Sequence, residues 1–164
     1  MGVFSLKADV QTWVIGLLAD PIAKMLARNS HLTKTQIETF LIDVLAEKMA
    51  ERKVLYEEKA QLRLLKSGVS RGAFNRTLRQ ARENIIKSIY TVVLLGYLGI
   101  LEGPQLQPYM ELANKLQTYR ETYRTRAKEG EISEGRKRIL SALQRELEEG
   151  LRNLVEPKNL STSV

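Results

Sequence analysis

The chain has 164 residues, of which 43% are hydrophobic and 27% charged, and its formal net charge is +7. A chain of this length buries roughly 70% of its unfolded surface, so one compact domain, or a small one with extensions, folds without a metal ion or a disulfide. The absence of cysteine and the single histidine exclude disulfide frameworks, thiol catalysis and structural zinc sites.

Apolar residues recur close to every fourth position almost throughout, and no run alternates strictly, which predicts an all-α fold. A first helix is predicted over 7–19. Asp20 and Pro21 then have the residue types of a cap and a first helical position, so a short second helix is predicted from there to Asn29. Trp13 has aliphatic neighbours at helical spacing, which favours a place in the core over base stacking.

The next predicted helix begins after a capping box made by Thr33 and Gln36. Its predicted inward residues are Ile37, Leu41, Val44, Leu45 and Met49. The apolar stripe loses its phase around 51–53, which predicts a break or bend followed by a helix over 55–66. A continuous helix through this point is the alternative.

A turn is predicted at Gly68 and Ser70. Glycine adopts a left-handed backbone at little cost and so ends helices. Ser70 would cap the following helix by accepting from a backbone N–H near Gly72 or Ala73. The new helix would then start two residues after the old one stops, as in a helix-turn-helix unit. Its predicted inward residues are Phe74, Leu78, Ala81 and Ile85.

Positive charge is concentrated in the same stretch. Between Arg63 and Lys87 the chain has seven basic residues and one acid, Glu83, a net +6 against +7 for the whole chain. Such a concentration is typical of a phosphate-binding surface. The side chains predicted to reach base edges are Arg71, Asn75, Arg76 and Arg79. Those predicted to contact phosphates are Arg63, Lys66, Ser70, Arg82 and Lys87.

The order GVS followed by RGAFNRTL resembles the turn and recognition helix of the helix-turn-helix superfamily. Upstream, the helix opened by 32–36 and a second helix running into Leu64 and Leu65 are similar to the four-helix version in sigma-factor region 4 and response-regulator output domains. The resemblance covers about a third of the chain, 32–85. It implies a recognition helix that enters the major groove, and a dimer would present two such helices about one DNA turn apart.

The most apolar stretch of the sequence follows, over 86–101. A helix that is apolar on nearly all sides is either buried at the centre of a fold or shared between subunits, and the two interpretations are compatible. Gly96 and Gly99 permit close backbone approach. Gly103 and Pro104 are predicted to end the element.

Two long amphipathic helices are predicted next, over 105–128 and from Ser133 onward, with a turn at 128–131. Together they predict an antiparallel hairpin whose apolar stripes pack within one chain or against a second subunit. Tyrosines at 109, 119 and 123, interleaved with arginines, fit a helix interface better than stacking on unpaired bases. From Pro157 the tail is polar and predicted to be disordered.

These elements predict four parts: an N-terminal helical cover (1–30), a helix-turn-helix domain with an extended recognition helix (31–103), a helical hairpin suited to dimerisation (104–156) and a disordered tail (157–164). The sequence has neither a stretch of ~20 uninterrupted apolar residues nor a signal sequence, so we expect a soluble cytoplasmic protein that does not enter a membrane.

The predicted function is a homodimeric, sequence-specific regulator of transcription that binds double-stranded DNA. The alternative is a helical oligomerisation or adaptor protein whose basic face is only solvated. An enzyme is not expected, because the sequence has no glycine-rich phosphate loop, no metal-ligand motif and no nucleophile paired with a base. No cofactor or metal is expected, and a small-molecule effector is unknown.

Overall fold

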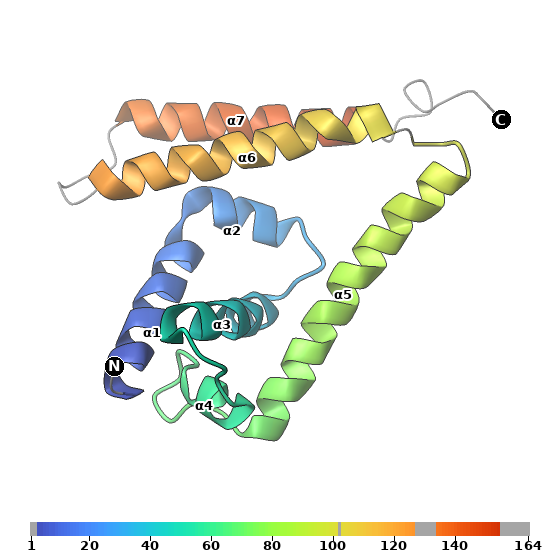
Figure 1. The fold of residues 1–164 in the computed structure, drawn as a ribbon. Helices are drawn as coiled ribbons and strands as arrows, with labels where there is room; N and C mark the ends of the chain where they lie inside the picture. Colours follow the sequence, from blue (N-terminus) through green and yellow to red (C-terminus); the bar gives the residue numbers. More distant parts are fainter. Residues whose placement is uncertain (1–2, 102, 127–133, 155–164) are drawn as a thin grey trace. The chain divides into compact units, whose positions relative to one another are not determined.

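The computed structural model describes residues 3–101, 103–126 and 134–154, and every regular element in these ranges is a helix (Figure 1). The all-α prediction is thereby confirmed. The helices are α1 (Val3–Ala19), α2 (Pro21–Arg28), α3 (Lys34–Ala50), α4 (Tyr56–Gln61), α5 (Arg71–Tyr97), α6 (Gly103–Arg126) and α7 (Glu134–Leu154). The chain divides into two compact units, Met1–Ile89 and Tyr90–Val164, and the division falls within α5.

The boundary between α1 and α2 is set by Asp20 and Pro21. Asp20 is extended, as a residue before proline must be, and its Oδ1 accepts from the Ala23 N–H at 2.9 Å. The predicted cap and proline start are confirmed, although α1 begins at Val3, earlier than predicted. No single described helix is long and apolar enough to cross a membrane. Judged by length and composition alone, α1 from Leu6 onward and α2 together meet the criterion for a membrane-spanning segment, as a pair bent by 72°.

Both ends of α3 are encoded locally. The Thr33 side chain accepts from the Gln36 N–H at 3.2 Å, and the Gln36 side chain accepts from the Thr33 N–H at 3.0 Å, so the predicted capping box is confirmed. The helix ends where Glu51 adopts a left-handed backbone, with φ of 51°. This confirms the predicted break at 51–53 and excludes the continuous helix.

The inward face of α3 agrees with the prediction in part. Leu41, Leu45 and Met49 pack half-buried against the core, whereas Val44 is 51% exposed, and the fully buried apolar residues are Ile42 and Ala46. The helix is rotated because it also buries polar side chains, among them Glu38 and Thr39, which hydrogen-bond to a buried arginine from another part of the unit. Apolar periodicity cannot locate a buried face that contains such polar residues.

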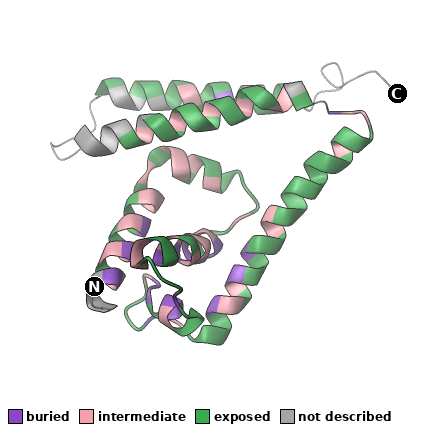
Figure 2. Cartoon of the chain, in the orientation of Figure 1, coloured by how far each residue is buried: buried purple, intermediate pink, exposed green. Residues whose placement is uncertain are grey.

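The core of the first unit draws on four helices and the segments beside α4. Figure 2 shows buried positions along one side of α1, on α3, around α4 and on the first turns of α5. The buried apolar side chains are Leu6, Val10, Val14, Ile42, Ala46, Val54, Ala60, Leu62, Phe74, Leu78 and Ala81. The predicted inward face of α5 is thus confirmed for its first three residues. Helix α1 contributes to this core, and it lies in the same compact unit as α3 and α4.

The connection between α4 and α5 is longer than predicted. Helix α4 ends at Gln61 and α5 begins at Arg71, so the predicted helix over 55–66 is confirmed at its start, but its predicted end and the two-residue turn are wrong. Residues 62–70 form the connection, which exceeds the roughly 3–4-residue turn of a helix-turn-helix unit. The chain leaves the helix early because the Leu62 side chain is buried and the Gln11 Nε2 donates to the Leu62 and Arg63 carbonyls at 3.2 and 2.8 Å.

Gly68 and Ser70 have the predicted local conformations at the end of this connection. Gly68 has a φ of +66°, and a Cβ there would lie 2.9 Å from both the Ala60 carbonyl oxygen and the Gln61 Cα. The Val69 N–H donates to the Ala60 carbonyl at 3.1 Å. Ser70 Oγ accepts from the Ala73 N–H at 3.2 Å and caps α5. The start of α5 is therefore fixed against α4.

In the second unit α5 ends at Tyr97 and not at Gly103–Pro104. Gly99 has a φ of +69°, the Ile100 N–H donates to the Leu95 carbonyl at 3.0 Å and the Gly99 N–H donates to the Gly96 carbonyl at 3.0 Å. This is the Schellman pattern, in which a left-handed glycine satisfies the last carbonyls of a helix. Gly103 instead begins α6.

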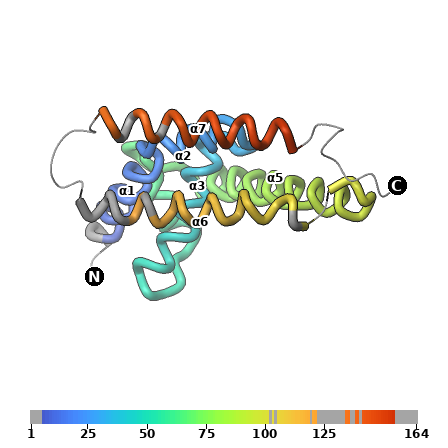
Figure 3. The backbone as a smooth tube through the Cα atoms, turned by 90° about the horizontal axis from the view of Figure 1, so that it is seen from above, coloured from blue at the N-terminus to red at the C-terminus, as the bar shows by residue number. Residues whose placement is uncertain are grey.

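Helices α6 and α7 lie alongside each other in opposite directions (Figure 3), as the predicted hairpin requires. The Tyr109 hydroxyl donates to the Gly150 carbonyl at 2.7 Å, so the two helices contact each other within one chain. Leu147 is buried and Leu112, Leu116 and Leu143 are half-buried. The predicted turn at 128–131, the Ser133 cap, the tail from 157 and the Tyr119 and Tyr123 side chains lie outside the described residues.

Candidate nucleic-acid interface

The predicted nucleic-acid contacts differ widely in exposure. Seven are exposed, one is half-buried and one is buried. The exposed residues are Lys66, Ser70, Arg71, Arg76, Arg79, Arg82 and Lys87. Asn75 is half-buried and Arg63 is buried. Five of the six exposed cationic side chains, those of Lys66, Arg71, Arg76, Arg79 and Arg82, are called the basic surface below.

Helix α5 presents most of the basic surface on the side next to its buried stripe. Phe74 and Leu78 face the core, and at 3.6 residues per turn Arg71, Arg82 and Arg79 follow in that order around the helix. Arg76 lies further round. Because the buried stripe fixes the rotation of α5, Arg76 and Arg79 project away from the core of the first unit, whereas Arg71 and Arg82 lie at its edge beside Glu57 and Asp43.

Two of these arginines have only loose partners. Arg71 Nη1 lies 3.5 Å from Glu57 Oε1, and Arg79 Nε lies 3.8 Å from Glu83 Oε1. All four side chains are more than half exposed. Exposed ion pairs of this kind contribute about 0–1 kcal/mol, so a phosphate group can displace either carboxylate at small cost.

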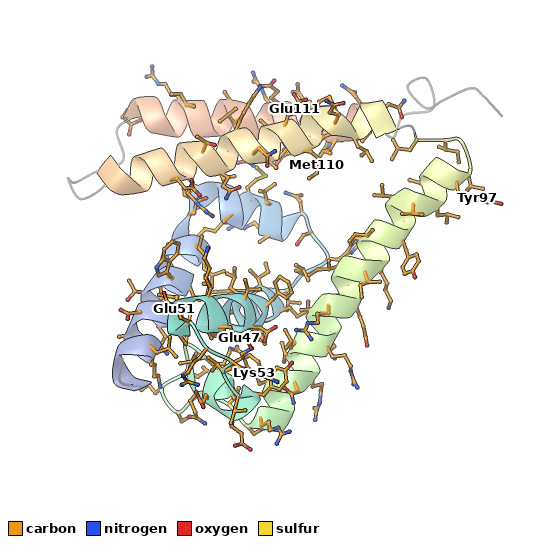
Figure 4. All side chains as sticks on the ribbon, in the orientation of Figure 1. Glu47, Glu51, Lys53, Tyr97, Met110 and Glu111 are labelled. Carbon is orange, nitrogen blue, oxygen red and sulfur yellow. The ribbon has the colours of Figure 1, made fainter. Side chains whose placement is uncertain are left out.

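Arg82 belongs to a tighter cluster. Its Nη2 lies 2.7 Å from Asp43 Oδ2, and the other Asp43 oxygen accepts from Lys59 Nζ at 2.7 Å. Lys59 is 3% exposed, donates also to Glu47 at 2.8 Å, and lies 5.2 Å from the centre of the Tyr56 ring. Figure 4 labels Glu47 on α3. Asp43 therefore pairs with both a buried lysine and a surface arginine. Arg82 is the member of the basic surface that is least available to bind a phosphate group.

This cluster shifts two pKa values. Burial lowers the pKa of Lys59, but hydrogen bonds to Asp43 and Glu47 outweigh burial and raise that pKa above its ordinary value of 10.5. The hydrogen bond from Lys59 lowers the pKa of Glu47 below its ordinary value of 4.5. Lys59 therefore stabilises the fold below pH 10.5, and this contribution is lost as pH rises through its raised pKa. The Glu47 contribution is present above pH 4.5 and is lost as pH falls through its lowered pKa.

Replacing Lys59 with methionine should lower the free energy of unfolding at pH 7 by about 1.5 to 3 kcal/mol, the usual range for hydrogen bonds to charged groups. The difference in the free energy of unfolding between the wild type and this variant should become smaller at pH values below the pKa of Glu47 and at pH values above the pKa of Lys59. Chemical denaturation across pH measures it. Lys48→Met, a change at an exposed position of α3, is the control. A difference that does not change with pH would contradict the role given to this cluster.

Arg63 is not a phosphate contact. Its side chain is 7% exposed, its Nε donates to Glu38 Oε1 at 2.6 Å and its Nη2 to Glu38 Oε2 at 3.2 Å. Its Nη1 donates to Thr39 at 3.0 Å, and Glu38 also accepts from the Leu64 N–H at 2.8 Å. The prediction treated every basic residue in the stretch as exposed. The chain instead turns Arg63 inward after α4 to neutralise a carboxylate on α3.

Asn75 is also poorly placed to read a base. Bidentate recognition of adenine requires both amide atoms to face the groove. The Asn75 Oδ1 is buried and, among the described side chains, is a buried polar atom without a hydrogen-bond partner. The contact set that remains for base edges is Arg71, Arg76 and Arg79, because the Asn75 amide oxygen is buried.

The prediction missed the acidic residues that come near the basic surface in space. Glu57 on α4 and Asp43 on α3 lie outside the stretch from Arg63 to Lys87, in which one acid was counted.

Among the described residues, no group of three or more histidine, aspartate or glutamate side chains is placed to share a metal ion. Comparisons with models of protein families, with characterised proteins and with solved structures find no match to this chain.

Proposed function

We propose that this chain binds double-stranded DNA through the basic surface and acts as a sequence-specific regulator of transcription. The observation that carries the proposal is the exposure of Lys66, Arg71, Arg76 and Arg79 around the first turns of one helix, where only loosely held carboxylates compete for two of them. Lysine and arginine side chains that neutralise phosphates release condensed counterions from DNA, and this release supplies much of the affinity.

Helix α5 has the dimensions for the role of a recognition helix. Its 27 residues span about 40 Å, and the major groove, about 12 Å wide, admits an α-helix. Arg71, Arg76 and Arg79 would pair with guanine O6 and N7, while Lys66, Ser70, Arg82 and Lys87 would contact phosphates. Helices α3, α4 and α5 follow one another in the order of a helix-turn-helix domain, but with the longer connection over 62–70. The proposal therefore depends on the charge and exposure of α5 and not on the geometry of the turn.

The proposal includes a homodimer in the cytoplasm that acts without a cofactor and catalyses no reaction. The adaptor function is the second candidate. It is favoured by the exposed apolar side chains on the second half of α5, which suit a protein partner.

Binding of the full chain to a labelled random-sequence duplex across a salt series tests the proposal. With about four to five phosphates neutralised, the logarithm of the binding constant should fall against the logarithm of salt concentration with a slope of about −4. An absence of binding at low salt would contradict the proposal and favour the adaptor function.

A further inference from the structure

The second half of α5 is mostly exposed (Figure 2), and many of its exposed residues are large and apolar. The exposed fractions run from 40% at Val92 to 87% at Tyr97, the residue that Figure 4 labels near the end of the helix. The sequence has no charged residue between Ile89 and Leu101. These exposed residues, called the apolar band below, are Ile86, Ile89, Tyr90, Val92, Val93, Leu94, Tyr97 and Leu98.

The apolar band places eight large, exposed apolar side chains along α5 and directly after its end. Contiguous apolar patches above a few hundred Å² mark sites of association in most soluble proteins. Burial of such side chains stabilises an interface by about 25 cal/mol per Å². The band therefore has the composition of a buried interface.

Four members of the apolar band form a coiled-coil seam. Ile86, Tyr90, Val93 and Tyr97 are separated alternately by four and three residues, the spacing of successive d and a positions in a heptad repeat. Each of them is more than half exposed. A helix with this seam fits a second helix with the same seam, which a second copy of this chain supplies.

We infer that two copies of this chain pair through the apolar band of α5, with the two helices antiparallel. The antiparallel direction places Tyr90 opposite Val93 and Tyr97 opposite Ile86 of the partner, so each large side chain meets a smaller one. A parallel pair would instead place tyrosine against tyrosine twice. Alternating large and small residues across a helix pair fill the interface without voids.

Repulsion between the two basic surfaces also favours the antiparallel arrangement of the helices. In a parallel pair the arginines of the two basic surfaces would lie on helices about 8–10 Å apart, a distance near the Debye length of roughly 8 Å at physiological salt. In the antiparallel pair the basic surfaces extend from opposite ends of the interface. With a rise of 1.5 Å per residue, their centres are about 45 Å apart along the helix axis. Repulsion between like charges therefore opposes the parallel dimer and is screened in the antiparallel one.

This inference rests on the homodimer of the proposed function but not on DNA binding. Sedimentation equilibrium of the full chain without DNA should give twice the chain mass of 18.7 kDa. Val93→Arg should give a monomer, with a dissociation constant raised at least 100-fold, because it puts a charge in the seam. Ile15→Arg, at a position 56% exposed against 58% for Val93, should leave the dimer intact. Both positions are exposed, so both variants should fold.

The results of these experiments distinguish the homodimer from the inferred interface on α5. A monomer at every concentration of the wild type would overturn both the homodimer and this inference, without bearing on the salt series. A wild-type dimer that survives Val93→Arg would overturn the inference and leave the homodimer standing.

Cross-linking tests the direction of the helices. The natural chain has no cysteine, so the introduced thiols are the ones that react. When Ile86→Cys and Tyr97→Cys proteins of different tag length are mixed and oxidised, the mixed dimer should be the main product, because a disulfide requires Cα atoms about 4.4–6.8 Å apart. Cross-linking of each variant chiefly with itself would show a parallel pair and overturn the inferred direction.

Discussion

Replacing Arg63 with methionine should lower the free energy of unfolding by about 3 to 5 kcal/mol, the usual cost of removing one partner of a buried ion pair. The guanidinium makes two hydrogen bonds to Glu38, whose side chain is 9% exposed, and a third to Thr39. Without Arg63, Glu38 keeps only the Leu64 N–H among these donors. Urea denaturation measured by circular dichroism gives the difference.

Arg76→Met is the matched control for this prediction, because it makes the same substitution on an exposed residue of α5. It should change the free energy of unfolding by less than about 0.5 kcal/mol. The double variant Glu38→Met with Arg63→Met should lose less stability than Arg63→Met alone, since no buried charge remains. If Arg63→Met cost no more than Arg76→Met, the buried pair assigned to Arg63 would be wrong.

Replacing Phe74 with alanine should destabilise the protein by about 3 to 5 kcal/mol, the range for removing a large buried aromatic side chain. Phe74 is 0% exposed and heads the fully buried side chains in volume. Its ring centre lies 6.4 Å from that of Tyr56, with the ring planes tilted by 43°. Phe74 thus attaches the first turns of α5, and with them the basic surface, to α4 and the core. Thermal or urea unfolding measures the loss.

Leu65→Ala provides the comparison, because Leu65 is an apolar residue of the neighbouring connection that is 55% exposed. It should cost less than about 0.5 kcal/mol. Equal losses from Phe74→Ala and Leu65→Ala would contradict the packing of α5 described above.

The sequence predicted the elements whose ends depend on neighbouring residues. The Asp20 cap, the Thr33 capping box, the break at Glu51, the left-handed Gly68 and the Ser70 cap are all local features, and each is confirmed. Each requires a hydrogen bond or a backbone conformation within a few residues, and residue type alone indicates such features.

The features that failed depend on residues far apart in the chain. Helix α4 stops at Gln61 because Gln11, Glu38 and Thr39 hold the chain beyond it, and their partners lie 24 to 52 residues away in sequence. The same contacts remove Arg63 from the candidate interface. The acids that approach Arg71 and Arg82 likewise come from α4 and α3. A net charge counted along one stretch of the sequence does not include these acidic residues.

The burial of Asn75 is a different kind of failure. The helical spacing placed it beside the arginines, which is correct, but its side chain is half-buried and its Oδ1 is buried. Whether a residue at such a position is exposed depends on what packs against the helix. The distinction between Arg79 and Asn75 could therefore not be drawn from spacing alone.

The central claim is that DNA contacts the basic surface of α5, and a pair of matched variants tests it most directly. Arg79 and Arg145 are exposed helical arginines, each with a glutamate four residues later, at 3.8 and 3.9 Å. On the random-sequence duplex of the salt series, where exposed arginines contact phosphates because no matching base pair is present, Arg79→Ala should make the slope about 0.9 less steep and weaken binding. Arg145→Ala on α7 should leave both the slope and the binding unchanged. Equal effects of the two substitutions, or an effect of Arg145→Ala alone, would contradict the claim.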